Sequence, residues 1–383
     1  MKFRAYCFAY CLIFFACGGP KTGEDGALHS LDISMDTVVI DPGQEILYLK
    51  RRVRVNAISE DKKYLYNVDP LKRSIEQINL NKLALEKKHH LEKEGPNGTE
   101  AIWAISLIGD DKLHINNSTN EHVFNWQAEK LESFNINEIG QESDLLEEGY
   151  QVHKTISIAS DGKQFASLIS DQEKKDMSFA IINIEDRTCK KFPAPAIDKA
   201  RNFEISSNEG GMGSILSASR YLIKEGGKVL LGTNVSNELY VLDETNDSLR
   251  HITFNSQLNP NEKSGTYPSE VGDQSQFDSY FQKIAEDINF MEPVWDEKKH
   301  VYYRMSFRSK FDENATAREG QPFLPTGSEC YISVLDKDLN LIAEDHFQTI
   351  DTYPNIYFAK DGKLWLFENI EDEMGFVRLD INW

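Results

Sequence analysis

The sequence predicts an all-β protein folded as a six-bladed β-propeller, and three observations support this fold class. Apolar strands that end at acidic turns recur along the chain with three equal intervals of 58 residues. Short turns similar to Asp-Gly-Lys recur between apolar runs, as tight hairpins require. The last repeat is one strand short, and unassigned strand material at the N-terminus can supply that strand. A fixed period of this kind is typical of short sheets repeated around a centre.

The first of these signals is an apolar strand followed by an acidic residue. With the last apolar residue before each turn as a marker, the successive spacings are 58, 58, 58, 93 and 44 residues. The six strands are Tyr64 to Val68, Val123 to Trp126, Phe179 to Ile184, Leu239 to Leu242, Tyr331 to Leu335, and Phe376 to Leu379.

The second signal is a turn that lies upstream of a strand pair in five of the repeats. The five turns are Asp110-Asp111-Lys112, Asp161-Gly162-Lys163, Glu225-Gly226-Gly227-Lys228, Asp296-Glu297-Lys298 and Asp361-Gly362-Lys363. Together the two signals predict a four-stranded unit, for example 101–108, 112–116, 123–126 and 131–136.

The third signal concerns the two ends of the chain. The last repeat has strands at 356–359, 364–367 and 376–381, and then the sequence stops. Apolar strand material at 31–33 and 37–40 precedes the first repeat, so we expect an N-terminal strand to complete the last blade and close the ring. This predicts one propeller domain over 31–383. The alternative is an open pair of β-sandwiches with coincidental spacing.

The N-terminal segment has the pattern of a targeting signal. Lys2 and Arg4 precede an uncharged apolar stretch of 12 residues that is too short to span a membrane, so 1–16 is predicted to be a signal peptide. Ala16-Cys17 resembles the cleavage box of bacterial lipoproteins, which predicts lipidation at Cys17 and a glycine-rich, acidic tether over 17–30. The alternative is a simple secretory signal in which this cysteine is incidental.

Composition excludes several function classes. The chain has 383 residues, of which 40% are hydrophobic and 27% charged, and its net charge is −20. That charge repels phosphate backbones, so nucleic acid is not an expected partner. Once the signal has been removed and Cys17 lipidated, Cys189 and Cys330 remain; they lie in different repeats and are expected to be separate thiols.

Motifs for catalysis or metal binding are missing from the sequence. It has no paired-histidine zinc helix, no phosphate-binding loop and no nucleophile elbow, so neither a catalytic residue, a metal nor a cofactor is predicted. His89-His90 is expected on a solvated helical segment between Ala84 and Glu94. The other histidines fall at scattered positions and suggest no triad.

Long connections predict the binding surface. Those at 81–100, 137–151, 194–214 and 255–291, with the excursion at 309–328, are expected to open on one face, near blades four to six. Within the longest connection, Phe277, Tyr280, Phe281 and Ile284 recur at helical spacing after Ser275, which predicts a short amphipathic helix capped by that serine.

An aromatic cluster with arginines marks the start of blade five. The candidate ligand- or partner-binding residues are Trp295, Tyr303, Arg304 and Arg308. On an alternating strand Tyr303 points away from the face that carries Arg304. An arginine among aromatic rings can bind a carboxylate, a phosphate or a sugar. The alternative is a structural salt bridge in an acidic protein.

The lipidation box at Cys17, the recurrent turns, and the stretch Glu292-Pro293-Val294-Trp295-Asp296 with Tyr302-Tyr303-Arg304 resemble the six-bladed, TolB-like propeller lipoproteins of the Bacteroidota. The resemblance covers residues 30 to 383 and implies a domain of unknown function without an enzymatic role.

These observations together predict a lipid-anchored propeller of the cell envelope, in the outer membrane, that binds an envelope protein or a small ligand through its loop-rich face. Two alternatives remain. One is a hydrolase or lyase with a metal or carboxylate site in the central channel, and the other is a structural subunit of an envelope complex.

Overall fold

The computed structural model describes residues 30–49, 55–117, 120–142, 150–171, 176–209, 212–243, 248–312 and 324–383. The predicted signal peptide, the lipidation site Cys17 and nearly all of the predicted tether lie outside these residues. Within the described ranges, no helix is both long and apolar enough to cross a membrane.

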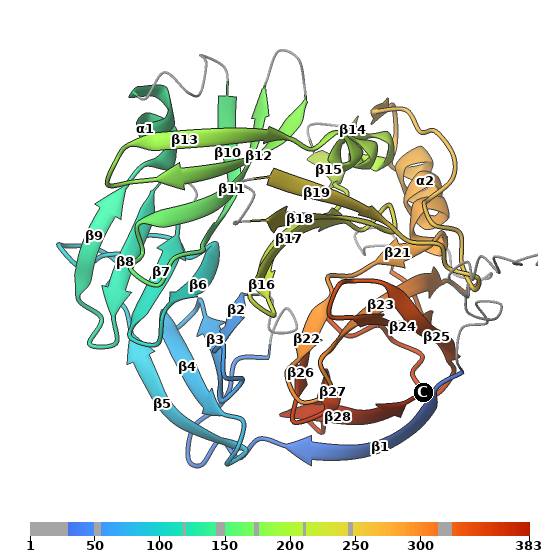
Figure 1. Ribbon diagram of the computed structural model, residues 1–383, viewed down its shortest axis with the longest axis horizontal. Coiled ribbons are helices and arrows are strands. Elements are labelled where there is room, and N and C mark those ends of the chain that lie inside the picture. Colours follow the sequence, from blue (N-terminus) through green and yellow to red (C-terminus); the bar gives the residue numbers. More distant parts are fainter. Residues whose placement is uncertain are drawn as a thin grey trace, which may run out of the picture.

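The regular structure of the described chain is mostly β-strand, arranged in consecutive sheets of four or five strands that follow one another around the centre of the molecule (Figure 1). Sheet 1 contains β2 (Asn56–Ile58), β3 (Tyr64–Asp69), β4 (Ser74–Asn79) and β5 (Ala84–His90). Sheet 2 contains β6 (Ala104–Ile108), β7 (Lys112–Asn116), β8 (Glu121–Asn125) and β9 (Lys130–Phe134). Sheet 3 contains β10 (Tyr150–Ser157), β11 (Gln164–Asp171), β12 (Met177–Asn183) and β13 (Thr188–Pro193).

The second half of the chain continues the pattern. Sheet 4 contains β16 (Arg220–Glu225), β17 (Lys228–Thr233), β18 (Glu238–Asp243) and β19 (Ser248–Thr253). Sheet 5 contains β21 (Asn289–Phe290), β22 (Val294–Asp296), β23 (Val301–Lys310), β24 (Gly327–Asp336) and β25 (Leu341–Phe347). Sheet 6 contains β26 (Tyr357–Lys360), β27 (Lys363–Ile370), β28 (Glu373–Asn382) and β1 (Asp32–Val39).

Three helices and a small extra sheet lie in the connections. The helices are α1 (Ile136–Glu142), a 3₁₀ helix (Pro195–Phe203) and α2 (Gln274–Glu286). The extra sheet contains β15 (Met212–Leu216), β14 (Ile205–Glu209) and β20 (Glu270–Val271). Helix α2 confirms the predicted amphipathic helix, since Phe277 and Ile284 are buried. Its cap is Asp273, whose carboxylate accepts from the Gln276 amide at 2.8 Å, and not the predicted Ser275.

The predicted acidic turns lie between consecutive paired strands of the structure. Four of them join the first strand of a sheet to the second, in sheets 2, 3, 4 and 6, and Asp296-Glu297-Lys298 joins β22 to β23 in sheet 5. Sheet 1 has an equivalent turn at Asp61-Lys62-Lys63 between β2 and β3, which the sequence pattern missed. There Asp61 Oδ1 accepts from the Lys63 amide at 3.0 Å and closes the turn.

Two details of the predicted repeat are wrong. Val68 lies in β3, the second strand of sheet 1, whereas each of the other five marker strands pairs with the outermost strand of its sheet. The first interval of 58 residues therefore joins positions that are not equivalent. The stretch around His89 is the outer strand β5 and not a helical segment, because β5 pairs with β4 along its whole length and sheet formation outweighs local helix propensity.

The two ends of the chain meet in sheet 6. All eight residues of β1 pair antiparallel with β28, from Asp32 opposite Asn382 to Val39 opposite Gly375 (Figure 1). The predicted N-terminal contribution to the last sheet is therefore present.

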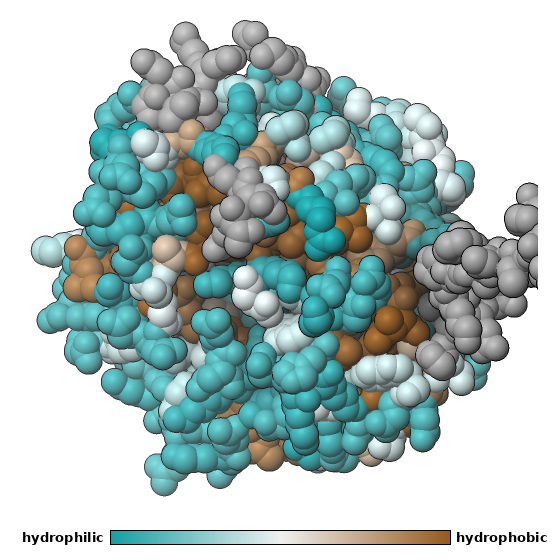
Figure 2. All heavy atoms as spheres, viewed as in Figure 1, coloured by the Kyte–Doolittle hydropathy of each residue, from teal (hydrophilic) through white to brown (hydrophobic). Residues whose placement is uncertain are grey.

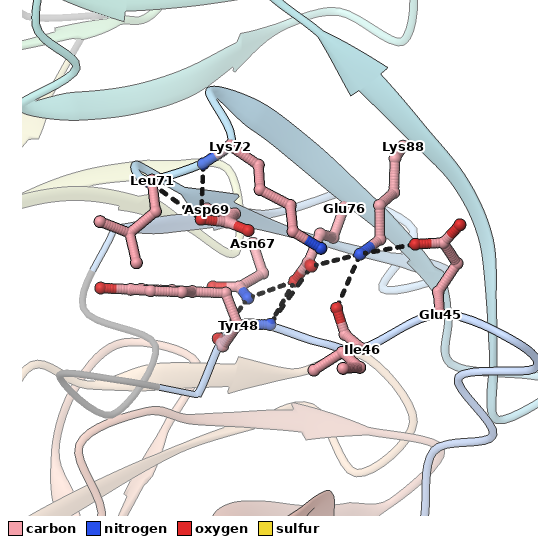
Figure 3. Close-up of polar contacts among 9 residues, drawn as sticks. All are labelled: Glu45, Ile46, Tyr48, Asn67, Asp69, Leu71, Lys72, Glu76 and Lys88. Atoms are coloured by element: carbon pink, nitrogen blue, oxygen red, sulfur yellow. Dashed lines mark hydrogen bonds and ion pairs between the residues drawn. The ribbon is translucent and has the colours of Figure 1, made fainter.

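A buried carboxylate fixes the chain that leaves β1 toward sheet 1. Glu76 in β4 is fully buried and accepts from the Tyr48 amide and from the Asn67 amide group, the latter at 2.7 Å. Lys88 in β5 lies 3.2 Å from the same carboxylate and donates to the Ile46 carbonyl at 2.7 Å (Figure 3). These bonds attach segment 45–48 to sheet 1, although it has no strand partner.

Hydrophobic side chains pack between neighbouring sheets. One cluster joins sheets 5 and 6, another joins sheets 3 and 4, and a third joins sheet 6 to sheet 1. In the view of Figure 2, hydrophilic residues cover the margins of the face, and hydrophobic residues are visible toward its middle. Cys189 and Cys330 are both buried and unpaired, which confirms that they are separate thiols.

Candidate functional site

The sequence-predicted Arg304 lies in β23 with its guanidinium enclosed by protein groups. Its side chain is 3% exposed. It donates to the Met291 carbonyl at 2.9 Å, to Asn237 Oδ1 at 2.6 Å and to the Tyr221 hydroxyl at 3.0 Å, and it lies over the Phe290 ring. Arg304 therefore links sheet 5 to sheet 4. The contacts are hydrogen bonds to neutral groups instead of the salt bridge that was the alternative expectation.

The other three predicted residues do not meet Arg304 in one open cleft. Tyr303 is fully buried between sheets 5 and 6, on the opposite face of β23, as the strand alternation predicts. Trp295 lies in β22, contacts Tyr302 in a tilted arrangement with ring centroids 4.7 Å apart, and donates to Glu297 at 2.6 Å. Arg308 is partly buried near the end of β23, where its Nε has no hydrogen-bond partner within the described part of the chain.

A large hollow lies elsewhere, among the first four sheets. It is a cavity of about 1020 Å³, which we call the central cavity. The first strands β2, β6, β10 and β16 contribute to its walls, together with residues of β7, β8, β11, β12, α1 and the 3₁₀ helix region. Both apolar and polar side chains line the cavity, as in many small-molecule sites. The residues that line it are Val55, Asn56, Trp103, Ala104, Ile105, Asn116, Glu121, Ile136, Asn137, Val152, His153, Lys154, Thr155, Leu168, Ser170, Asp171, Met177, Arg201, Glu204 and Arg220.

Lys154 is one of the cations in the wall of the central cavity. Its side chain is partly exposed, and among the described residues no acceptor bonds to its ammonium group. The two arginines in the wall are paired: Arg201 lies 3.1 Å from Asp198, and Arg220 lies 2.5 Å from Glu204. Burial lowers the pKa of Lys154 below its ordinary value, and the charge of Glu292 opposes that shift. An anion that enters the cavity finds one ammonium group ready to donate.

An irregularity in β10 places the neighbouring side chains of His153 and Lys154 in the cavity. The pairing of β10 with β11 shifts between Val152 and Lys154, so His153 is the extra residue of a β-bulge. His153 Nε2 lies 2.5 Å from the Ser170 hydroxyl oxygen, and both residues line the cavity. Burial and the nearby Arg220 lower the pKa of His153 below its ordinary value, and the charge of Glu204 opposes that shift.

An exposed tryptophan stands at the cavity wall. Trp103 is 66% exposed, although its backbone amide is fixed by the Asn116 carbonyl at 2.9 Å. A large aromatic side chain that is exposed while its backbone is held rigid is well suited to cover an apolar ligand.

The described residues contain no cluster of three or more metal-ligating side chains. One alternative prediction was a hydrolase or lyase with a metal site in the central channel. The described residues offer no set of ligands for such a metal. Sequence reasoning also missed the central cavity. The prediction followed loop length toward blades four to six, whereas the cavity is lined by residues of four sheets that only the fold brings together.

Comparison with known proteins now places the chain. The model of a domain of unknown function, DUF4221, matches residues 28–346. The chain belongs to the DUF4221 family. No curated protein matches it.

Three solved structures are similar to this DUF4221 chain. A DUF4221 member from Bacteroides vulgatus is 16% identical, with a TM-score of 0.66, over 93% of this chain and 99% of that one. A Bacteroides fragilis protein, provisionally described as exported, is 8% identical, with a TM-score of 0.51, over 92% and 96%. The β-propeller domain of Cps50 (Swd1) from Myceliophteria thermophila is 7% identical, with a TM-score of 0.38, over 89% and 99%.

Membership of DUF4221 bears out the expected family of unknown function, and the structure has the predicted all-β, propeller-like organisation. The TolB-like relationship, the lipid anchor and the envelope location stay predictions.

Proposed function

We propose that this protein is a closed, six-bladed propeller outside the cytoplasm, anchored by a lipid at Cys17, which binds a small anionic ligand in the central cavity. Six sheets in chain order and the pairing of β1 with β28 support the six blades and the closure. The apolar leader before Cys17 and the similarity to a provisionally exported Bacteroides fragilis protein support the location. The loop-rich face of the sequence prediction is kept, and the binding site is moved from blade five to the cavity.

The observation that carries the binding role is Lys154. It is a partly buried ammonium group to which no acceptor of the described residues bonds, in a cavity of about 1020 Å³, inside a protein whose net charge is −20. Keeping an unpaired charge in such a place is unfavourable unless a ligand neutralises it. Val152, Leu168 and Met177 line the same cavity and add apolar surface. The expected ligand therefore carries one carboxylate, phosphate or sulfonate on an apolar body.

Fluorescence titration with the anionic dye 8-anilinonaphthalene-1-sulfonate tests this proposal. We expect saturable binding of one dye per chain and at least a tenfold weaker affinity in Lys154→Met, because a charge-assisted hydrogen bond contributes about 1.5–3 kcal/mol. Lys87→Met, which removes an exposed lysine from β5, is the matched control and should bind the dye like the wild type. Equal affinity in wild type and Lys154→Met would contradict the proposal.

A further inference from the structure

A chain of hydrogen bonds runs across three neighbouring strands of sheet 2. Ser106 in β6 lies opposite His114 in β7, and the Ser106 hydroxyl oxygen is 2.9 Å from His114 Nδ1. His114 Nε2 is 2.7 Å from a carboxylate oxygen of Glu121 in β8. The second oxygen of Glu121 accepts from the Asn116 amide group at 2.9 Å. Serine, histidine and carboxylate are thus connected in the order of a nucleophile, a base and an orienting acid.

His114 and Glu121 are both buried, at 1% and 4% exposed. An ionised carboxylate only accepts hydrogen bonds, so opposite ionised Glu121 the hydrogen lies on His114 Nε2. In that neutral tautomer of the ring, the lone pair of Nδ1 faces Ser106, whose hydroxyl donates to it. The ring also packs against Phe165 of sheet 3, with centroids 5.2 Å apart, which holds its orientation.

The serine is the accessible end of this chain. Of the three side chains only that of Ser106 is partly exposed. Ala104 and Ile105, on the same strand, line the central cavity, as do Asn116 and Glu121. Ser106 and His114 are not themselves among the lining residues, but Ser106 lies two positions after Ala104 on β6 and so on the same face of that strand.

We propose that Ser106 is a nucleophile toward acyl esters bound in the central cavity, with His114 as its general base and Glu121 as the residue that positions the imidazole. The substrate class, an ester that carries an anionic group, rests on the proposed function of Lys154. This activity differs from the metal or carboxylate enzyme that the sequence left as an alternative.

The step is balanced within the site. Ser106 Oγ forms a bond to the ester carbonyl carbon, its proton moves to His114 Nδ1, and the carbonyl π electrons move onto oxygen. When the carbonyl re-forms, the bond to the alkoxy oxygen breaks and the alcohol leaves with the proton from His114. Water then adds to the acyl group on Ser106, gives its proton to His114, and releases the carboxylic acid as the serine is restored.

The cavity contains a second serine and histidine pair, Ser170 and His153, which serves as an internal comparison. The described part of the chain places no carboxylate within hydrogen-bonding distance of the His153 ring. Without an orienting acid this pair lacks the third member, so we expect Ser106 to react first.

A fluorophosphonate reagent, which phosphonylates activated serines, tests the proposal on the whole folded chain. We expect one phosphonyl group per chain, located on Ser106 by peptide mass spectrometry, and none in Ser106→Ala. Glu121→Gln should label at least a hundredfold more slowly, because the imidazole loses its anionic partner. Ser133→Ala, which changes an exposed serine of β9 in the same sheet, is the matched control and should label like the wild type.

Thermal melting and dye binding of each variant show whether it is folded. Labelling of Ser170, labelling that survives Ser106→Ala, or no labelling of a folded wild-type protein would each overturn the nucleophile. Hydrolysis of 4-nitrophenyl hydrogen succinate should exceed that of neutral 4-nitrophenyl acetate, and Lys154→Met should remove the preference. If the wild-type protein binds the dye but is not labelled, the nucleophile is refuted and the proposed function stands. If Ser106 is labelled but Lys154→Met changes neither dye affinity nor substrate preference, only the anionic ligand is refuted.

Discussion

Asp36 in β1 accepts two hydrogen bonds from the guanidinium group of Arg378 in β28, at 2.5 and 2.9 Å, although the two residues are 342 positions apart in the chain. Lys363 of β27 donates to the same carboxylate at 2.8 Å. Beside the backbone pairing, one side chain thus attaches the N-terminal strand to two strands of the last sheet.

Replacement of Asp36 should weaken this attachment slightly. Because the carboxylate is substantially exposed, we expect Asp36→Asn to lower the free energy of unfolding by at most about 1 kcal/mol. Asp32→Asn, at an exposed position of the same strand, is the control and should have no effect. Urea unfolding of the three proteins measures the difference.

The effect of Asp36 should depend on pH. Hydrogen bonds from Arg378, and then from Lys363, lower the pKa of Asp36 from 3.8 to about 2. A carboxylate whose pKa is lowered on folding stabilises the protein above its unfolded pKa and loses that contribution as the pH falls through the folded value. The gap between wild type and Asp36→Asn should be full above about pH 4 and close toward pH 2. A gap that widens on acidification would contradict this assignment.

Arg304 should prove structural. Its removal leaves the Asn237 oxygen, the Tyr221 hydroxyl and the Met291 carbonyl without their buried donor, so Arg304→Ala should cost about 3 kcal/mol or more of unfolding free energy. Arg308→Ala, on the same strand, should cost clearly less. Dye affinity of the folded Arg304→Ala protein should match the wild type, and a selective loss of binding with unchanged stability would restore the blade-five site.

Two adjacent glycines in the turn between β16 and β17 offer a matched pair. Gly226 and Gly227 both have positive φ, of 57° and 71°. A Cβ on Gly226 would come within 2.9 Å of the Trp295 ring, whereas a Cβ on Gly227 would have no neighbour within 4 Å. We expect Gly227→Ala to cost about 1 kcal/mol, and Gly226→Ala to cost a further 1–3 kcal/mol or so through the clash. Equal costs in thermal unfolding would contradict the packing of Trp295 on this turn.

Dye binding should weaken as the pH rises. The sulfonate stays ionised, so the change reports the protonation of Lys154, whose pKa burial places below 10.5. The other charged residues at the cavity are paired arginines and carboxylates, and the pKa of His153 is lowered. Affinity should therefore fall at a pH below the ordinary lysine range in the wild type and stay flat in Lys154→Met. A pH profile shared by both proteins would assign the titration to another group.

The repeat could be predicted because turn chemistry is local. An acidic residue that bonds its own backbone marks a hairpin wherever it occurs, as at Asp296 and Asp161, and the terminal strand was expected from the strand missing in sheet 6. Sheet 1 differs from the prediction because its outer strand, around His89, has a helix-forming composition.

The site could not be predicted in the same way. Lys154 and Arg220 are 66 positions apart, and only the arrangement of sheets brings their strands to one cavity. Ser106, His114 and Glu121 are close in sequence, yet their connection depends on the register of three strands, which sequence patterns do not specify. The sequence pattern near Trp295 predicted a binding site, but its aromatic and arginine side chains pack sheet 5 against sheet 4. A cluster of this kind looks the same in the sequence whether it binds a ligand or joins two sheets.

The most direct test of the central claim is a crystal structure of the protein with 8-anilinonaphthalene-1-sulfonate. We expect the dye in the central cavity, with its sulfonate bonded to Lys154 Nζ and its rings beside Trp103. Dye bound against Trp295 and Arg304, or a central cavity without dye in a protein that binds the dye in solution, would contradict the account.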